Sequence, residues 1–202
     1  MKYSFFIDGF NFYHSLHDNK LYHKYKWIDY YKLASLFIKK TDTISGVYWF
    51  TALANWNPEK RQKHQLLIRA SELSNVQIIY GEFKRKDKYC TLCKRYFISR
   101  EEKMTDVNIA IYLFDMAYHD TYDKAIIVSA DSDLIPTIKA VHKNFPTKEI
   151  GILLPICRRS ESLKNEADFH MKIKEKHLKS SLFPEEIHIE NNQILKCPDS
   201  WK

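Results

Sequence analysis

Residues 124–133 have the sequence Lys-Ala-Ile-Ile-Val-Ser-Ala-Asp-Ser-Asp, a short apolar run that ends in a serine and two acids. The run Ala125–Val128 is apolar at every position, which is typical of a parallel strand with both faces covered. In open parallel sheets, functional side chains collect beyond the carboxyl ends of the strands. This stretch therefore predicts a buried parallel strand with a polar site at its end.

Other segments repeat this strand-like pattern and alternate with segments of helical spacing. The predicted strands are Tyr3–Asp8, Val47–Leu53, Val76–Phe83, Lys124–Ser129 and Glu149–Leu154. The predicted helices are Asp29–Lys39, Pro58–Leu73, Thr105–Ala117 and Ser132–Lys143. Strands that alternate with helices indicate an α/β fold, in which helices cover both faces of a parallel sheet.

The composition bounds the class of protein. The chain has 202 residues, of which 45% are hydrophobic, enough for the core of a single globular domain. It lacks a run of roughly 20 apolar residues and a signal-peptide pattern, so we expect a cytoplasmic protein without a membrane partner. Four scattered cysteines agree with a reducing compartment. The net charge of +7 favours an anionic partner.

Two regions depart from the alternating pattern. A basic insertion at about residues 84–100 contains a Cys-x-x-Cys motif, and a charged C-terminal tail covers residues 176–202. We therefore predict one domain over residues 1–175, which the insertion interrupts and the tail follows.

Four aspartates are predicted to meet at one edge of the sheet. Asp8 ends the first strand, and Asp131 and Asp133 follow the strand quoted above. Asp106 begins a helix that Thr105 can cap. Crowded carboxylates repel one another, and protonation or a cation with oxygen ligands, such as Mg²⁺ or Mn²⁺, relieves the repulsion. The alternative is that each aspartate only ends a strand or caps a helix.

Three segments resemble motifs of the NYN domain family, part of the PIN-like nuclease superfamily. They are Phe6–Phe12 (FIDGFNF), Glu102–Val107 (EKMTDV) and Val128–Leu134 (VSADSDL), and the resemblance extends from about Lys2 to Ile173. It implies a Rossmann-like, PIN-type sheet and cleavage of RNA with Mg²⁺ or Mn²⁺. The family's acidic positions match Asp8, Asp106, Asp131 and Asp133, and its polar positions match Asn11 and Ser129. Ala130 stands where glycine is common, and its methyl group would be costly if the backbone φ were positive.

The predicted function is a divalent-metal-dependent ribonuclease, most simply an endoribonuclease. The carboxylates would hold the ion, Asn11 would orient a bound water or a phosphate oxygen, and Ser129 or Thr105 would brace the carboxylates. One alternative is a non-catalytic RNA-binding or regulatory protein. Another is a hydroxylase of a pyridine compound, an activity assigned to a branch that resembles the family.

Basic side chains in and beside the insertion are predicted to bind the substrate. This substrate is single-stranded or structured RNA, with DNA as an alternative. The basic residues are Lys84, Arg85, Lys86, Lys88, Lys94, Arg95 and Lys103, with Arg158 and Arg159 after the last predicted strand. Tyr89, Tyr96 and Phe97 lie among them, and unstacked bases bind such rings while phosphates pair with cations. A solvated hairpin with a small aromatic core would have the same composition.

Cys90 and Cys93 form half of a zinc-ribbon motif. Tetrahedral zinc needs two more ligands, and neither Cys157 nor Cys197 has a ribbon-like spacing. We therefore expect structural zinc only if a histidine or a second subunit completes the shell. A homodimer is one of the expected states.

Overall fold

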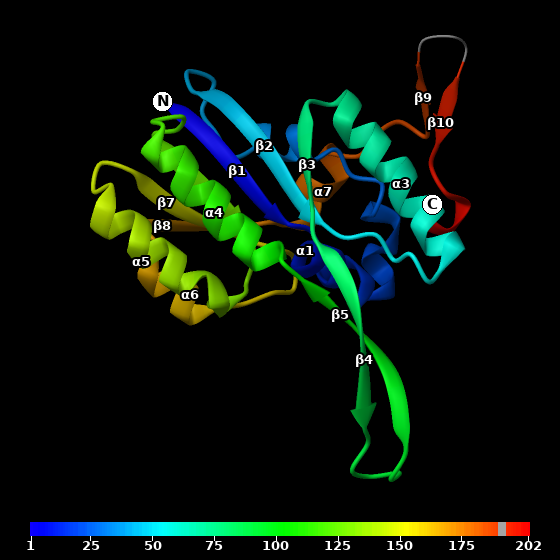
Figure 1. Cartoon of the computed structure of the whole chain (residues 1–202). Coiled ribbons are helices and arrows are strands. Elements are labelled where there is room, and N and C mark those ends of the chain that lie inside the picture. Colours follow the sequence, from blue (N-terminus) through cyan, green and yellow to red (C-terminus); the bar gives the residue numbers. More distant parts are fainter. Residues whose placement is uncertain (190–192) are drawn as a thin grey trace.

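The computed structural model describes residues 1–189 and 193–202, and a six-stranded sheet forms its centre (Figure 1). Every neighbouring pair of strands in this sheet is parallel. The order across the sheet is β3 (Val76–Tyr80), β2 (Thr43–Thr51), β1 (Lys2–Asp8), β6 (Lys124–Val128), β7 (Glu149–Leu154) and β8 (Phe169–Lys172). The predicted α/β class with a parallel sheet is confirmed.

Alternate residues of the strands face two separate apolar cores, because successive side chains of a strand point to opposite faces. In β1, Phe5 and Ile7 are buried in one core and Phe6 in the other. The first core includes residues of α1 (Gly9–His17), α2 (Tyr30–Ser35), α3 (Pro58–Leu73) and α7 (Glu175–Ser180). The second includes residues of α4 (Thr105–Tyr118), α5 (Ile135–Asn144) and α6 (Glu161–Glu166). Helices therefore cover both faces of the sheet (Figure 1).

The strand predicted over Val76–Phe83 is two strands. β3 ends at Tyr80, and β4 (Glu82–Tyr89) leaves the sheet. Between them, the Gly81 N–H donates to the carbonyl oxygen of Thr51 (2.8 Å), and a Cβ at Gly81 would lie 2.7 Å from the carbonyl oxygen of Lys103. Gly81 therefore lets the chain turn at a point where two other backbone segments approach closely.

Two helix predictions need correction. The helix expected over Asp29–Lys39 is short, because Asp29 caps α2 and the helix ends at Ser35. The one expected over Ser132–Lys143 begins as a 3-10 turn, η2 (Ser132–Leu134), and continues as α5 from Ile135. Among the described residues, no helix is both long and apolar enough to cross a membrane.

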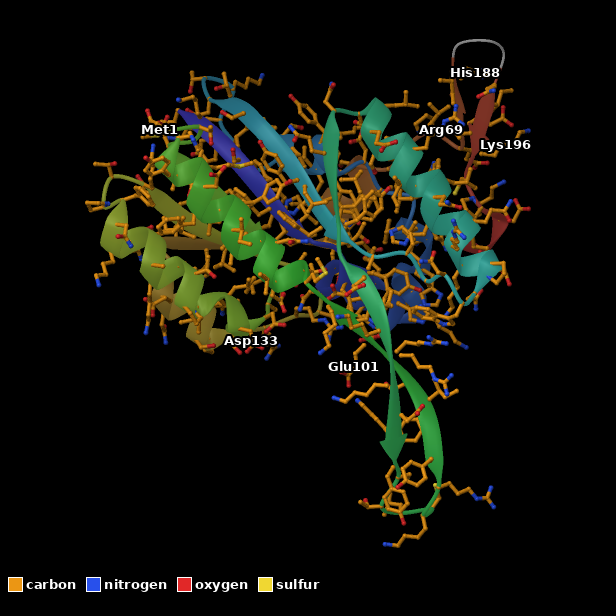
Figure 2. The ribbon with its side chains drawn as sticks, in the orientation of Figure 1. Met1, Arg69, Glu101, Asp133, His188 and Lys196 are labelled. Carbon is orange, nitrogen blue, oxygen red and sulfur yellow. The ribbon has the colours of Figure 1, made fainter. Side chains whose placement is uncertain are left out.

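The segment after residue 175 packs against the body instead of forming a loose tail. It contains α7, β9 (Glu186–His188), β10 (Ile194–Lys196) and the 3-10 turn η4 (Asp199–Trp201). The Trp27 indole N–H donates to the carbonyl oxygen of Pro184 (2.8 Å), and its ring packs against Phe183 and Trp201. Arg69 of α3 donates to Gln193 beside β10 (2.8 Å). Figure 2 shows Arg69 on the side of α3 that is nearest to β10, which carries Lys196. The sequence did not predict this packing because the apolar residues concerned are widely spaced.

The basic insertion is an antiparallel hairpin, which we call the arm (residues 82–103). β4 pairs with β5 (Tyr96–Lys103), and the register runs from Glu82 opposite Lys103 to Tyr89 opposite Tyr96. The arm projects from the body (Figure 1), and most of its side chains are exposed.

Candidate active site

Asp8 is the most deeply buried acid of the predicted site. It ends β1, and only 4% of its surface is exposed. Its Oδ1 accepts a hydrogen bond from the Asn11 N–H (2.9 Å), and its Oδ2 accepts one from the Ser129 hydroxyl (2.7 Å). Burial raises the pKa of Asp8, and these two hydrogen bonds oppose that rise. The carboxylate is therefore held in one orientation inside the protein.

Gly9 lets α1 begin directly after Asp8. A Cβ at this position would lie 2.3 Å from the Trp49 Nε1 and 2.5 Å from the carbonyl oxygen of Phe50, both in β2. A larger residue would push the helix away from the sheet. The Asp-Gly pair thus allows Asp8 to cap the helix and brings Asn11 to the sheet edge.

Hydrogen bonds join the ends of β1 and β6, which are neighbours in the sheet. Ser129 donates to Asp8 and accepts from the Asp131 N–H (3.0 Å). The Asn11 Oδ1 accepts from the Ala130 N–H (3.2 Å), so its NH₂ group remains as its donor. Asp131 in turn accepts from the Asp133 N–H (3.0 Å). Asn11 and Ser129 are therefore well placed to position the acids.

Ala130, which stands where glycine is common in the family, has no backbone strain. Ala130 is not among the residues with positive φ, so its methyl group meets no left-handed conformation. Met104 does have positive φ (78°), immediately before α4. The strained position near the acids is thus in the second family motif and not in the third.

Asp106 shows that the acids share one electrostatic environment. Burial raises its pKa to about 6, and repulsion from Asp8, Asp131, Glu102 and Asp133 adds to the effect. Figure 2 shows Asp133 at the edge of the body from which the arm projects. Within the described part of the chain, none of these five acids forms an ion pair with lysine, arginine or histidine. We call this group of five acids the acidic site.

Glu102 is the member of the acidic site that sequence reasoning missed. It lies near the end of β5, and its Oε1 accepts from the Thr105 N–H (3.2 Å) and from the Thr105 hydroxyl. It also raises the pKa of Asp8 and Asp106. In the sequence, Glu102 stands among many other charged residues of the arm, so it was not singled out although it belongs to the EKMTDV motif.

Thr105 does not cap α4. The N-cap is Met104, without a side-chain hydrogen bond, and Thr105 is the first helical residue. Its hydroxyl donates to Glu102, so the predicted bracing of a carboxylate concerns Glu102. The expectation of a Thr105 cap was wrong because the preceding residue is left-handed.

The chemistry of the acidic site suits a hard divalent cation. Its members offer only oxygen ligands, and their mutual repulsion favours a positive charge among them. Across residues 1–189 and 193–202, no three acidic, histidine or cysteine side chains are arranged closely enough to count as a ready-made metal shell. The five acids therefore form a convergent set of donors, and not a closed coordination sphere.

Most of the basic residues predicted to bind nucleic acid are paired within the arm. Glu101 lies within 3.4 Å of the ammonium groups of Lys86, Lys88 and Lys103. Lys84 pairs with Glu82 and Arg85 with Asp87. Lys94 and Arg95, at the arm tip, form no ion pair with described residues. Arg158 binds Asp18 (2.7 Å) and Arg159 is exposed. The cations differ, therefore, in their freedom to bind a phosphate.

An aromatic group near the acids was also missed. Phe83 of β4 packs against Phe10, which follows Asp8 by two residues, and against Trp56 (ring centroids 5.8 and 4.8 Å). The Arg100 guanidinium lies 5.0 Å from the Trp56 ring centre. Phe10 and Trp56 are each 41% exposed. No sequence period connects these residues, because they come from three separate segments.

A cationic group lies along α1. The Lys26 ammonium lies 3.0 Å from the His17 Nδ1, and the rings of His17 and His23 are stacked. Burial lowers the pKa of Lys26, and Lys60 and Lys63 lower it further. Like charges that lower one another's pKa indicate a surface with excess positive potential.

The parallel sheet, its two helical layers and the acids beyond β1 and β6 define the class of protein. It is a Rossmann-like α/β domain with an acidic site at the carboxyl edge of the sheet. The chain belongs to the NYN domain family, whose model matches residues 2–174. The NYN domain has a PIN-like nuclease fold, so the family predicted from the three motifs is confirmed.

Two known proteins are similar to this chain. The 6-hydroxy-3-succinoylpyridine 3-monooxygenase HspA of Pseudomonas putida is 22% identical over an alignment of 214 positions, gaps included, which covers 87% of this chain and 66% of that protein. A crystal structure of VPA0982, a protein of unknown function from Vibrio parahaemolyticus, superposes with a TM-score of 0.60. That match covers 90% of this chain and 96% of the other at 18% identity, and it supports the fold alone.

Proposed function

We propose that this protein is a divalent-metal-dependent ribonuclease that cleaves internal phosphodiester bonds of RNA. The acidic site carries the proposal, because its five carboxylates repel one another and have no cationic partner among the described residues. Aromatic side chains include Phe10, two residues after Asp8, and a cationic group lies along α1, the helix that Asp8 caps. A divalent ion would relieve the repulsion, and a polyanion with exposed bases would suit the surrounding groups.

The chain's own residues have distinct roles in this proposal. Asp8, Asp106, Asp131 and Asp133 would hold Mg²⁺ or Mn²⁺, with Glu102 as a further acid. A bound ion of this kind polarises a phosphate and lowers the pKa of a water. Ser129 and Asn11 link the ends of β1 and β6, so the spacing of Asp8 and Asp131 is set before substrate binds. Thr105 holds Glu102 at the start of the helix that carries Asp106.

Single-stranded RNA is the substrate that the surroundings favour. Trp56 and Phe10 are partly exposed, so unpaired bases have rings on which to stack. Lys26 of the cationic group, with Lys60 beside it, would bind flanking phosphates, as would Lys94 and Arg95 of the arm. Arg158 is a weaker candidate, because Asp18 already occupies its guanidinium.

The test is cleavage of labelled single-stranded RNA, duplex RNA and matched single-stranded DNA in Mn²⁺, Mg²⁺ or EDTA. We expect single-stranded RNA to be cut with either ion and to remain intact in EDTA. Asp131→Asn, prepared identically, should lose more than about 100-fold in rate, since even residues that only position ligands change activity by about 10–100-fold. Asp115→Asn is the matched control, because Asp115 is an exposed acid of α4 that pairs with His119.

Two results would redirect the assignment. RNA that binds but remains uncut with both ions would indicate a regulatory RNA-binding protein. Because the chain is similar to HspA, the protein is also assayed with 6-hydroxy-3-succinoylpyridine as a substrate. Hydroxylation of that compound, without cleavage of RNA, would favour the monooxygenase chemistry of that relative.

A further inference from the structure

The tip of the arm is a tight, ordered turn around two cysteines. Beyond the last strand pair, Tyr89 opposite Tyr96, the Cys90 N–H donates to the carbonyl oxygen of Arg95 (2.9 Å). The Lys94 N–H donates back to the carbonyl oxygen of Cys90 (2.9 Å), and Lys94 has a left-handed backbone (φ 56°). The loop is therefore folded back on Cys90 in a defined conformation.

This turn directs polar hydrogens at one sulfur. The backbone N–H groups of Cys93 and Leu92, together with the Cys93 thiol, are directed at the Cys90 sulfur. Amides directed at a sulfur stabilise a metal-bound thiolate as well as a free one, as hydrogen bonds around a ligand do in general. The two cysteines are therefore arranged as two neighbouring ligands of one ion.

The ligand set is incomplete within one chain. Cys157 follows β7 and Cys197 is buried in the first core, so both belong to the body and not to the arm tip. In the part of the chain that the structure describes, no third cysteine, histidine or acid joins Cys90 and Cys93 in a metal-binding group. Structural zinc takes four ligands in a tetrahedron, so two must come from elsewhere.

We propose that a zinc ion joins two copies of this chain at the arm tips, bound by Cys90 and Cys93 of each copy. Each thiol releases its proton to solvent as its sulfur binds the ion, so four protons leave for each zinc bound. The proposal concerns the arm alone and holds whether or not the acidic site cleaves RNA.

Charge complementarity supports a second copy as the source of the missing ligands. Zn²⁺ with four thiolates has a net charge of about −2. Lys94 and Arg95 of each copy stand beside this centre and form no ion pairs with described residues, so their charges offset it. Without the ion, two basic arm tips would repel each other. The pairing of the tips should therefore depend on the metal.

Exposed apolar side chains at the tip also support a second copy as the partner. Leu92, between the two cysteines, is 93% exposed, and Tyr96 is 78% exposed. A second tip bound through the same zinc would cover part of this surface and add apolar contact to the metal bonds. The arm carries each tip away from the body, so two copies can meet there without contact between their sheets (Figure 1).

The experiment measures zinc content and molar mass of the full chain, purified with zinc under a reducing agent. We expect about one zinc for every two chains and a dimer by light scattering, with conversion to a zinc-free monomer by a strong chelator. Cys90→Ser and Cys93→Ser should each be monomeric and lose the zinc. Cys157→Ser is the control, because it removes an exposed thiol of the body and should leave both measurements unchanged. Cobalt in place of zinc should give thiolate-to-cobalt absorption that both arm variants lack.

Three outcomes would overturn the proposal. They are a monomer without bound zinc, a monomer with one zinc per chain, and a dimer that persists in the chelator. Failure of the cleavage assay has no bearing on these outcomes, since the zinc measurements use no RNA. If either serine variant fails to fold, the zinc-to-chain ratio and the chelator response of the natural protein still show whether zinc joins two chains.

Discussion

The acidic site and the arm both contain many charged side chains, but the charges of the arm are mostly paired with opposite charges, whereas those of the acidic site are not. In the arm, hydrogen bonds from Lys88, Lys103 and Lys86 hold the pKa of Glu101 at about 2. In the acidic site, burial and neighbouring acids raise the pKa of Asp106 to about 6. Most charged side chains of the arm form exposed ion pairs with one another, whereas the acids of the acidic site have like charge and repel one another. Like charge that accumulates on a buried scaffold is relieved by protonation or by a ligand of opposite charge, and at neutral pH such a site favours the ligand.

Outside the carboxylates themselves, the largest effect on the acidic site is expected for Ser129→Ala. This change removes the hydroxyl that donates to Asp8 and accepts from the Asp131 N–H, both near the sheet edge. We expect a loss of about 10–100-fold in metal affinity or cleavage, the usual range for a group that positions ligands. Titration with Mn²⁺ and the cleavage rate measure it. Ser45→Ala, at the exposed start of β2, is the control, and an equal loss there would remove the special role of Ser129.

A smaller effect is expected in the arm, from the double change Lys94→Ala and Arg95→Ala. Apart from Arg100, which lies against the Trp56 ring, these residues are the arm cations without ion pairs in the described chain, so they are free to bind phosphates. RNA binding should weaken for all sequences alike, and the slope of log affinity against log salt should fall by about two. Measurement in EDTA prevents cleavage and metal-linked pairing of chains. The exposed pair Lys39 and Lys40, changed to alanine, should leave the slope unchanged. If the slope were unchanged in the arm variant, residues of the body and not the arm tip would contact the RNA phosphates.

The smallest effect is expected for Met104→Gly, at the junction of the two regions. Met104 has a left-handed backbone and is 49% exposed, so glycine removes strain with little loss of burial. We expect the free energy of unfolding to rise by about 1 kcal/mol, the usual cost of this conformation for a residue with a Cβ. Urea denaturation measures it. Val107→Gly, within α4, should instead lower stability, because glycine is a poor helix former. A loss in both variants would mean that the Met104 side chain is needed.

The parts of the fold that local sequence controls were the parts that could be predicted. Pro58–Leu73 has helical spacing with a proline in its first turn, and Glu149–Leu154 is a nearly continuous apolar run, so both bounds agree with α3 and β7. The edge strand β8 was missed, because its residues alternate between partly exposed and exposed and lack such a run. The break at Gly81 was missed too, since it depends on Thr51 and Lys103, which are distant in sequence.

The same distinction holds for the acidic site. Asp8, Asp131 and Asp133 could be placed together because each follows a recognisable strand, and parallel topology brings strand ends to one edge. Glu102 could not be placed with them, because it lies at the base of the arm, and tertiary packing determines where that base meets the body. Phe10, Trp56 and Phe83 were missed for the same reason, since each stands alone in its segment.

The most direct test of the central claim compares the stability of the natural protein with that of Asp106→Asn, without metal and with Mn²⁺. The pKa of Asp106 is raised above 3.8, so its stabilising contribution is present at low pH and is lost as pH rises through about 6. In EDTA, we therefore predict equal stability at about pH 3, below the ordinary pKa of an aspartate in the unfolded chain, and a more stable variant at about pH 8. At about pH 8, Mn²⁺ should stabilise the natural protein and have a much smaller effect on the variant. A variant that is no more stable than the natural protein in EDTA at this pH, or that gains equally from Mn²⁺, would contradict the account.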